Sequence, residues 1–297
     1  MIFEGNYLKG EKNGKGKEYF YNGILKFEGD YLNGQRNGKG KEYDNNGKLI
    51  FEGKYLNGER NGIGKEYYYD GNLEFEGKYS KGKRWNGKIY NKNKDIEFKI
   101  NNGNGKVKEY DKYGDLKFEG KYLKGERNGK GKEYHDNGKL KFDGEYLNGQ
   151  RKGKGKEYYD NGNLKFEGEY LKGKKWNGKG YNINGNIEFN INKGNGKGKE
   201  YYDNGKLKFE GHYLNGERRG KGKEYYSDGK LKYDGYYLNG KRNGNGKEYN
   251  EIGILEFEGS YLNGQRNGHG KEYYNDGKLK FEGEYLNEEK KRERISQ

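Results

Sequence analysis

The sequence predicts an all-β protein, an elongated single-layer array of antiparallel β-hairpins that repeats along the chain as a twisted solenoid. Three observations predict this fold. The tripeptide Phe/Tyr-Glu/Asp-Gly recurs at nearly constant spacing, apolar and polar residues alternate with a period of two inside each unit, and Asn-Gly pairs separate the alternating segments. A fixed period of this kind is typical of proteins in which each repeat packs only on its neighbours.

The repeating unit is 24 residues long in most of the chain. Two intervals are 43 residues long, and each contains a degenerate unit, around Phe98 or Phe189. A longer period of 91 residues indicates that a block of units was duplicated whole. The tripeptide begins at Phe3, Phe27, Phe51, Phe75, Phe118, Phe142, Phe166, Phe209, Tyr233, Phe257 and Phe281.

These spacings define the predicted domain organisation. We expect one array of about 13 units over residues 1–286, irregular at 82–108 and 173–199. Residues 287–297 abandon the pattern and are rich in Glu, Lys and Arg. We expect this charged C-terminal tail to protect the last strand edge, because repeat arrays need polar ends.

Residues 23–47 illustrate the predicted hairpin. Apolar and charged residues alternate over 25–31 (Leu-Lys-Phe-Glu-Gly-Asp-Tyr), which is the pattern of a strand with one apolar face. Residues 33–38 are predicted to form the turn, and 39–43 the returning strand. Asn46-Gly47 then suits a type I′ turn, which needs positive φ at both central residues.

The composition constrains how such units gain stability. Only 28% of the residues are hydrophobic and the mean hydropathy is -1.56, which by itself favours disorder. However, proline is absent and the 56 glycines recur at fixed intervals. One hairpin buries too few large side chains to fold alone, so we expect Phe and Tyr to form a ladder shared between neighbouring units.

The repeated motif resembles the MORN (membrane occupation and recognition nexus) repeat over almost the whole chain. Residues 27–31 (Phe-Glu-Gly-Asp-Tyr) are similar to the family's Tyr-Glu-Gly-x-Trp/Tyr core, and residues 34–40 to its Gly-x-x-x-Gly-x-Gly tail. Residues 137–144 follow the Asn-Gly-Lys-Leu-x-Phe-Glu/Asp-Gly pattern of a subtype found in repeat-only and antitoxin-like proteins. The resemblance implies a binding or scaffolding role, often at membranes or the cytoskeleton.

The sequence offers no constellation that suggests catalysis. The chain has no Cys, and its three histidines occupy three different positions of the repeat, without the spacing of a metal pair. Carboxylates recur identically in every unit, whereas a catalytic pair needs two different environments. We therefore predict no enzyme activity, no cofactor and no metal, and we expect the histidines to be solvent-exposed substitutions: His135, His212 and His269.

The formal net charge of +15 favours anionic partners. One arginine follows the Asn/Lys-Gly pair in most units, and in a turn these side chains would form a row along one long edge. We expect that edge to contact anionic lipid headgroups, nucleic acid or an acidic protein, with a solvated edge that only prevents aggregation as the alternative. The residues are Arg36, Arg60, Arg127, Arg151, Arg218, Arg242 and Arg266.

The two tryptophans, Trp85 and Trp176, lie 91 residues apart in the two irregular segments. A tryptophan in such a segment is a candidate anchor for a partner. The alternative, which we prefer, is that each ring fills the bulge or bend that the broken register creates.

We predict a non-catalytic scaffold that presents a repetitive surface to a protein partner and to anionic membrane phospholipid. The alternatives are an antitoxin-like protein that neutralises a toxin, and a basic nucleic-acid-binding protein. Nucleic acid is disfavoured, because the ladder needs the aromatic rings that would otherwise stack on bases. The N-terminus lacks the features of a secretory signal, so we expect a cytoplasmic protein, peripheral at membranes or the cytoskeleton; a homodimer is left open.

Overall fold

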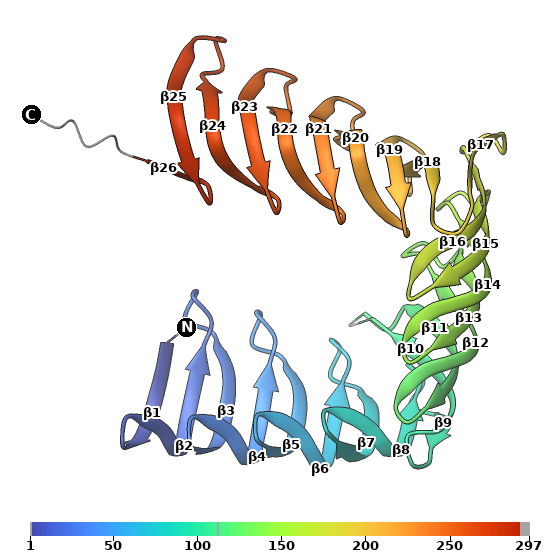
Figure 1. The fold of residues 1–297 in the computed structure, drawn as a ribbon. Coiled ribbons are helices and arrows are strands. Elements are labelled where there is room, and N and C mark those ends of the chain that lie inside the picture. Colours follow the sequence, from blue (N-terminus) through green and yellow to red (C-terminus); the bar gives the residue numbers. More distant parts are fainter. Residues whose placement is uncertain (1, 112, 292–297) are drawn as a thin grey trace, which may run out of the picture. The chain divides into compact units, whose positions relative to one another are not determined.

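Alternating apolar and charged residues produce the predicted strands throughout the computed structural model, which describes residues 2–111 and 113–291. These residues form strands and tight turns, without a helix. No helix that could cross a membrane is therefore found in the described part of the chain. The strands lie in three open antiparallel sheets, and each strand pairs with its neighbours in chain order (Figure 1). The predicted all-β single-layer hairpin array is confirmed.

The chain divides into two compact units, of which the first is Met1–Gln150. Strands β1–β9 form one sheet there, and β10–β13 follow one another in the next. The strands are β1 (Ile2–Leu8), β2 (Glu11–Tyr19), β3 (Leu25–Leu32), β4 (Gln35–Tyr43), β5 (Leu49–Leu56), β6 (Glu59–Tyr67), β7 (Leu73–Ser80), β8 (Lys83–Tyr90), β9 (Ile96–Ile100), β10 (Gly105–Tyr110), β11 (Leu116–Leu123), β12 (Glu126–Tyr134) and β13 (Leu140–Leu147).

The second unit is Arg151–Gln297. Strands β14–β17 follow one another in chain order, and β18–β26 form a sheet. The strands are β14 (Gln150–Tyr158), β15 (Leu164–Leu171), β16 (Lys174–Tyr181), β17 (Ile187–Ile191), β18 (Gly196–Tyr201), β19 (Leu207–Leu214), β20 (Glu217–Tyr225), β21 (Leu231–Leu238), β22 (Lys241–Tyr249), β23 (Leu255–Leu262), β24 (Gln265–Tyr273), β25 (Leu279–Leu286) and β26 (Glu289–Lys290).

The turn assignment differs from the sequence prediction. Asn33 and Gly34, with φ of 48° and 77°, form a two-residue turn by themselves, so residues 35–38 belong to strand β4. Asn46-Gly47 is not a two-residue turn. There Asp44 accepts hydrogen bonds through Oδ1 from the amides of Asn46 and Lys48, and only Gly47 has positive φ. The prediction was wrong because Asn-Gly fits either turn; the longer one is closed by a backbone hydrogen bond from the Asp44 amide to the Lys48 carbonyl, and it also forms where Phe20 stands in place of Asp44.

The core of each unit is the predicted aromatic ladder. The Phe27 ring is fully buried and contacts Tyr31 of its own repeat and Tyr55 of the next, with ring centroids 5.6 and 5.2 Å apart. The same edge-to-face contacts recur in the second unit, where Tyr233 meets Tyr261 at 5.2 Å. Each ring therefore stabilises two repeats at once, as edge-to-face aromatic pairs do.

Two short strands interrupt the regular hairpins. Strands β9 and β17 have only five residues each, and an isolated bridge follows each of them, Asn101 to Asn104 and Asn192 to Asn195. At the C-terminus the hairpin register continues past residue 286, because β26 pairs with β25 and the Glu288 carboxylate accepts a hydrogen bond from the Arg266 amide. Of the expected charged tail at 287–297, residues 292–297 lie outside the described residues.

Candidate functional site

The predicted arginine edge lies in strands rather than turns, and its guanidinium groups stack on the core. In the first unit the Arg36 guanidinium carbon lies 4.0 Å from the centroid of the Phe27 ring. Arg218 has the same distance to the Phe209 ring in the second unit. The planar guanidinium is suited to such a contact with an aromatic face.

Each stacked arginine also bridges carboxylates of neighbouring repeats. Arg36 donates hydrogen bonds of 2.6 Å to Glu18 and to Glu42, and Glu42 also pairs with Arg60 of the next repeat. Burial alone would raise the pKa of the Glu18 carboxyl, but hydrogen bonds from Arg36 and Lys12 outweigh it and hold that pKa below its usual value. We call these alternating side chains the Arg/Glu ladder.

The Arg/Glu ladder runs beside the aromatic ladder in both units. In the second unit Glu224 accepts from Arg218 at 2.6 Å and from Arg242 at 3.0 Å. The side chains of these two arginines are only 17% and 15% exposed, so most of each cation faces the protein. The role of the seven arginines as an anion-binding edge stays a prediction, whereas their intramolecular contacts are seen directly.

The tryptophans occupy the irregular repeats in strands β8 and β16. Their carbonyl groups accept hydrogen bonds of 2.7 Å from the amides of Gly103 and Gly194, respectively. Both side chains are half-buried, and a Cβ atom at Gly194 would lie 2.9 Å from the Trp176 ring. Trp176 thus packs on the loop that joins β17 to β18. The role of Trp85 and Trp176 as partner anchors stays a prediction.

Two of the three histidines are exposed as expected, but His135 is buried, with 7% exposure. The prediction was wrong for His135 because its repeat position holds a ring of the core. The equivalent residues of two sister repeats, Tyr68 and Tyr159, are also buried. Among the described residues no group of three or more His, Asp or Glu could hold a metal ion.

The opposite face of the sheet carries a groove that the sequence analysis did not identify. Its floor is a row of glycines that lie opposite one another from strand to strand, Gly16 to Gly29, Gly29 to Gly40, Gly40 to Gly53 and Gly53 to Gly64. A Cβ atom at Gly40 would clash with the Phe27 ring on the core side. The core therefore requires glycine. Because a side chain at any of these positions would point toward the core, only backbone lines the other face along this row.

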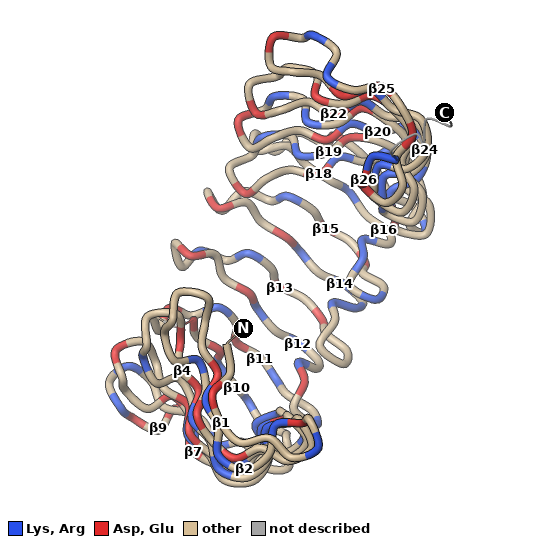
Figure 2. Tube along the Cα trace, turned by 90° about the vertical axis from the view of Figure 1, so that its left-hand side faces the viewer, with Lys and Arg blue, Asp and Glu red and all other residues tan. Residues whose placement is uncertain are grey.

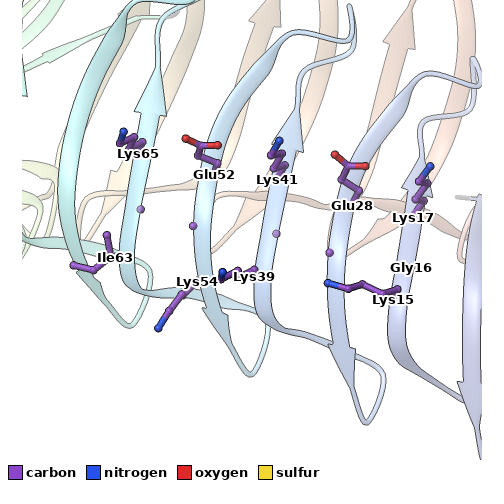
Figure 3. A pocket seen from close by; sticks show the side chains of 14 residues that line it. Lys15, Gly16, Lys17, Glu28, Lys39, Lys41, Glu52, Lys54, Ile63 and Lys65 are labelled. Atoms are coloured by element: carbon purple, nitrogen blue, oxygen red, sulfur yellow. The ribbon is translucent and has the colours of Figure 1, made fainter.

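Two rows of side chains flank this floor in the first unit and enclose a groove of about 560 Å³ (Figure 3). We call the first row the Lys/Glu wall; it consists of Lys17, Glu28, Lys41, Glu52 and Lys65. We call the second row the variable wall, because its residue types change from repeat to repeat; in this groove it consists of Lys15, Lys39, Lys54 and Ile63.

The Lys/Glu wall alternates in charge, with three lysines and two glutamates in this groove. Lys17 lies opposite Glu28, and Lys41 opposite Glu52, on adjacent strands. The Tyr43 hydroxyl donates a hydrogen bond of 2.7 Å to Glu28. Burial and this bond to Glu28 raise the pKa of Tyr43 to about 12. Such cross-strand pairs of opposite charge stabilise a sheet, so this wall has a structural role in every repeat.

The variable wall of the first unit is cationic and incompletely paired. Lys15 reaches Asp30 at 2.7 Å, but Lys39 and Lys54 lie directly opposite each other. Within the described part of the chain neither ammonium group has a carboxylate at ion-pair distance. Ile63 follows with 63% of its surface exposed.

The second unit repeats the groove with a different variable wall. A groove of about 760 Å³ lies over Gly198, Gly211 and Gly222, and a further one of about 530 Å³ lies over Gly235, Gly246 and Gly259. Lysines and acidic residues alternate along the Lys/Glu wall here as well (Figure 2). The variable wall carries Lys197, His212, Lys221, Tyr236, Asn245, Ser260 and His269.

The grooves could have been inferred from one sequence signal, the residues that change between otherwise constant repeats. These residues follow Phe-Glu-Gly and stand between the two glycines of Gly-x-Gly. Only the register shows that the two positions face each other across the strands, as in Lys39 and Lys54. In the groove over β2–β6 the lining side chains are lysines, glutamates and one isoleucine, which suit binding of a partner through ion pairs and hydrogen bonds.

Comparisons with known proteins agree with this architecture. A family model described as MORN repeat matches residues 3–24, 27–48, 51–73, 142–164, 209–230, 233–253 and 257–278. A second, described as MORN repeat variant, matches residues 127–148 and 195–215. Together these matches cover more than half of the chain. No curated protein sequence gives a significant match to the whole chain.

Among solved structures, one described as "Crystal Structure of TcdB2-TccC3-Cdc42" is 13% identical, with a TM-score of 0.15, over 91% of this chain and 17% of that chain. Another, "Crystal Structure of TcdB2-TccC3-TEV", is 12% identical, with a TM-score of 0.14, over 96% of this chain and 18% of that chain. The chain thus spans less than a fifth of these structures, and TM-scores this low do not indicate a shared fold. The family matches, the 24-residue hairpin and the shared aromatic ladder lead to one assignment: the chain belongs to the MORN repeat family.

Proposed function

We propose that this chain is a non-catalytic binding scaffold whose glycine-floored grooves hold a partner protein. The single observation that carries the proposal is the division of labour between the two faces. The core face uses its aromatic, arginine and glutamate side chains for packing, while the groove face keeps a row without side chains between two polar walls. MORN repeats are in general protein- or lipid-binding scaffold modules, which is consistent with this use.

The wall composition supports a protein as the main partner. The Lys/Glu wall is the same in both units, so it serves the sheet, whereas the variable wall changes from Lys39 and Lys54 in one unit to Asn245 and Ser260 in the other. Residues that differ between repeats of one architecture can give each groove its own specificity.

Site-specific photo-crosslinking tests the proposal. A benzophenone amino acid replaces Ile63 in one groove and, as the matched control, Lys9 in the turn that joins β1 and β2. In cells of the native host we expect a discrete protein adduct from position 63 and none from position 9. The trapped protein, once purified, should bind the wild-type chain and lose affinity for groove variants. Adducts from position 9 alone, or none from either position, would contradict the proposal.

An exposed leucine row favours a second candidate, peripheral contact with anionic lipid. Leu32 and Leu56 end their strands with 50% and 48% exposure, next to the Asn-Gly turns. Apolar side chains beside cationic ones suit a membrane surface. Ser80 stands at the same repeat position, so Leu32→Ser with Leu56→Ser should leave the fold intact. Wild type should sediment with phosphatidylserine vesicles at low salt and this variant should not; no sedimentation of wild type at low or physiological salt would end this candidate.

A further inference from the structure

We infer that the groove over β2–β6 takes an extended acidic polypeptide segment, in which an acidic residue recurs at about every third position. This inference rests on the proposed function and specifies its ligand in one of the two units. The ligand would lie along the glycine row, across the strands, with its carboxylates toward Lys15, Lys39 and Lys54 of the variable wall (Figure 3).

The first argument is an electrostatic cost that the fold offsets only in part, through the attraction between Lys39 and the Asp30 carboxylate. Like charges directly opposite each other on adjacent strands destabilise a sheet, and Lys39 faces Lys54 in this way. The same wall has a second such pair, Lys106 and Lys121, on β10 and β11. The fold itself does not require these pairs, because the equivalent position on β22 and β23 is filled by Asn245 and Ser260. An anion bound between the two ammonium groups would offset the repulsion.

The second argument distinguishes a polypeptide from a nucleic acid. The facing wall presents Glu28 and Glu52 between its lysines, and these interrupt the positive charge that a continuous row of phosphates would require but can accept hydrogen bonds from peptide amides. Single-stranded nucleic acids gain much of their affinity from stacking on aromatic rings. The side chains that line this groove include no aromatic ring, and the Phe27 and Phe51 rings are buried on the other face.

The third argument is the match between two repeat lengths. Two strands per hairpin, about 4.8 Å apart, place equivalent groove positions about 9.6 Å apart. A polyproline II segment rises about 3.1 Å per residue, so three residues advance about 9.3 Å. An acidic side chain at every third residue therefore meets the cationic wall once per hairpin. Ile63, one hairpin beyond Lys39, lies opposite Lys78 on β7, which would meet the next acidic residue of the ligand.

Binding of synthetic peptides to the full chain tests the inference. The probe is a fluorescein-labelled peptide of Glu-Pro-Ala repeats, which favours the polyproline II conformation. A control peptide has the same composition with its glutamates grouped in one block, and a labelled oligothymidylate represents nucleic acid. Fluorescence anisotropy is measured at low and at physiological salt. We expect the spaced peptide to bind most tightly, and more weakly as salt rises.

Two charge-matched variants locate the site. Lys39→Asn with Lys54→Ser installs the pair that β22 and β23 already contain. Lys9→Asn with Lys81→Asn removes two charges from turns, where Asn33 and Asn57 occupy the equivalent positive-φ positions. The groove variant should lose roughly ten-fold in affinity for the spaced peptide, because exposed ion pairs are individually weak, and the turn variant should stay within about two-fold of wild type.

Three outcomes would overturn the inference: equal binding of the spaced and grouped peptides, equal losses in the two variants, or tighter binding of the oligothymidylate through Lys39 and Lys54. Failure here is distinguishable from failure of the proposed function. If the spaced peptide does not bind while the crosslinker at position 63 still traps a protein, the scaffold role stands and the ligand class is wrong.

Discussion

Single glycines are the residues on which this fold depends most, and for two different physical reasons. Gly40 lies in a strand with ordinary backbone angles, but a side chain there would enter the space of the Phe27 ring. Gly34 has open space around it, but its φ of 77° belongs to the left-handed region. The first glycine is required by packing between repeats, and the second by the backbone of one turn.

These two causes give different expected costs for the same substitution. We expect Gly40→Ala to destabilise by about 2–3 kcal/mol, since the methyl group must displace a packed ring. Gly34→Ala should cost about 1 kcal/mol, the penalty of an L-residue in the left-handed region. Urea unfolding followed by tyrosine fluorescence measures both. A larger cost for Gly34→Ala than for Gly40→Ala would show that the ladder tolerates displacement of the ring.

Arg60 illustrates how one residue combines packing and charge. It stacks on Phe51 at 4.0 Å and pairs with both Glu42 and Glu66. Removing it leaves two partly buried carboxylates without this partner, so Arg60→Met should destabilise by about 3 kcal/mol in chemical denaturation. Arg60→Lys should cost about 1 kcal/mol, because Lys12 fills the same position over Phe3 in the first repeat. Equal costs for Met and Lys would indicate that only the packing of the side-chain stem matters.

At the level of the element, the hairpin is a module that recurs along the chain with the same strand register. Within each sheet, each strand pairs with the strands that precede and follow it in the chain. Residues one whole period apart have equivalent partners: Phe27 lies opposite Glu42, and Phe51 lies opposite Glu66. The fold is therefore additive in whole hairpins, and it fails when the period is broken, since a shift in register moves core side chains to the wrong positions.

Deletion of one module tests this property. Removing residues 28–51, which is one 24-residue period, joins Phe27 to Glu52 and restores the Phe-Glu-Gly motif. We expect a folded protein with unchanged β-type circular dichroism per residue and slightly lower stability. The matched control removes only residues 28–39, which is half a period, and should abolish cooperative unfolding of the first unit. If the whole-period deletion aggregates while the control folds, the modular description is wrong.

At the level of the whole molecule, the shifted pKa values of the repeats make the free energy of unfolding depend on pH. The pKa of Glu272 falls to about 2: burial alone would raise it, but hydrogen bonds from Lys280 and Lys290 outweigh this. In the folded protein that pKa lies below its usual value near 4.5, so the stabilisation is complete above pH about 4.5 and is lost as the pH falls toward 2. Tyrosines shift the other way, since burial and Glu28 raise the pKa of Tyr43 to about 12, from 10.

We therefore expect a stability plateau between pH about 5 and 10. Below this range, carboxylates with lowered pKa values become protonated, and the folded state binds these protons more weakly than the unfolded state does. Above it, tyrosines with raised pKa values lose protons that the folded state binds more tightly than the unfolded state does. Thermal unfolding recorded across the pH range by circular dichroism measures both limbs. Arg60→Met should alter the acid limb, because the Arg60 guanidinium helps to hold the pKa of the Glu66 carboxyl below its usual value. A melting temperature that is flat between pH 2 and 5 would contradict a stabilising role for the ion pairs.

The sequence by itself determined the repeat, the strands and the core. Phe27 and Tyr31 each lie two positions from Gly29, and the 24-residue period brings Tyr55 to the next place in the ladder, so period and alternation were enough. The sequence also indicates that two irregular segments interrupt the 24-residue repeat. These features follow from the spacing of residues within the sequence, and the contacts between repeats have the same period.

Only the tertiary structure decided where the charges and the groove lie. The spacing of the sequence allows Arg36 to lie in a turn or in a strand. Its position in the structure depends on two contacts, with the Phe27 ring and with Glu18, which is 18 residues away. Likewise Lys39 and Lys54 are 15 residues apart and become a facing pair only through strand register. Contacts between repeats depend on which residues are brought opposite each other, and that pairing is a property of the assembled sheet.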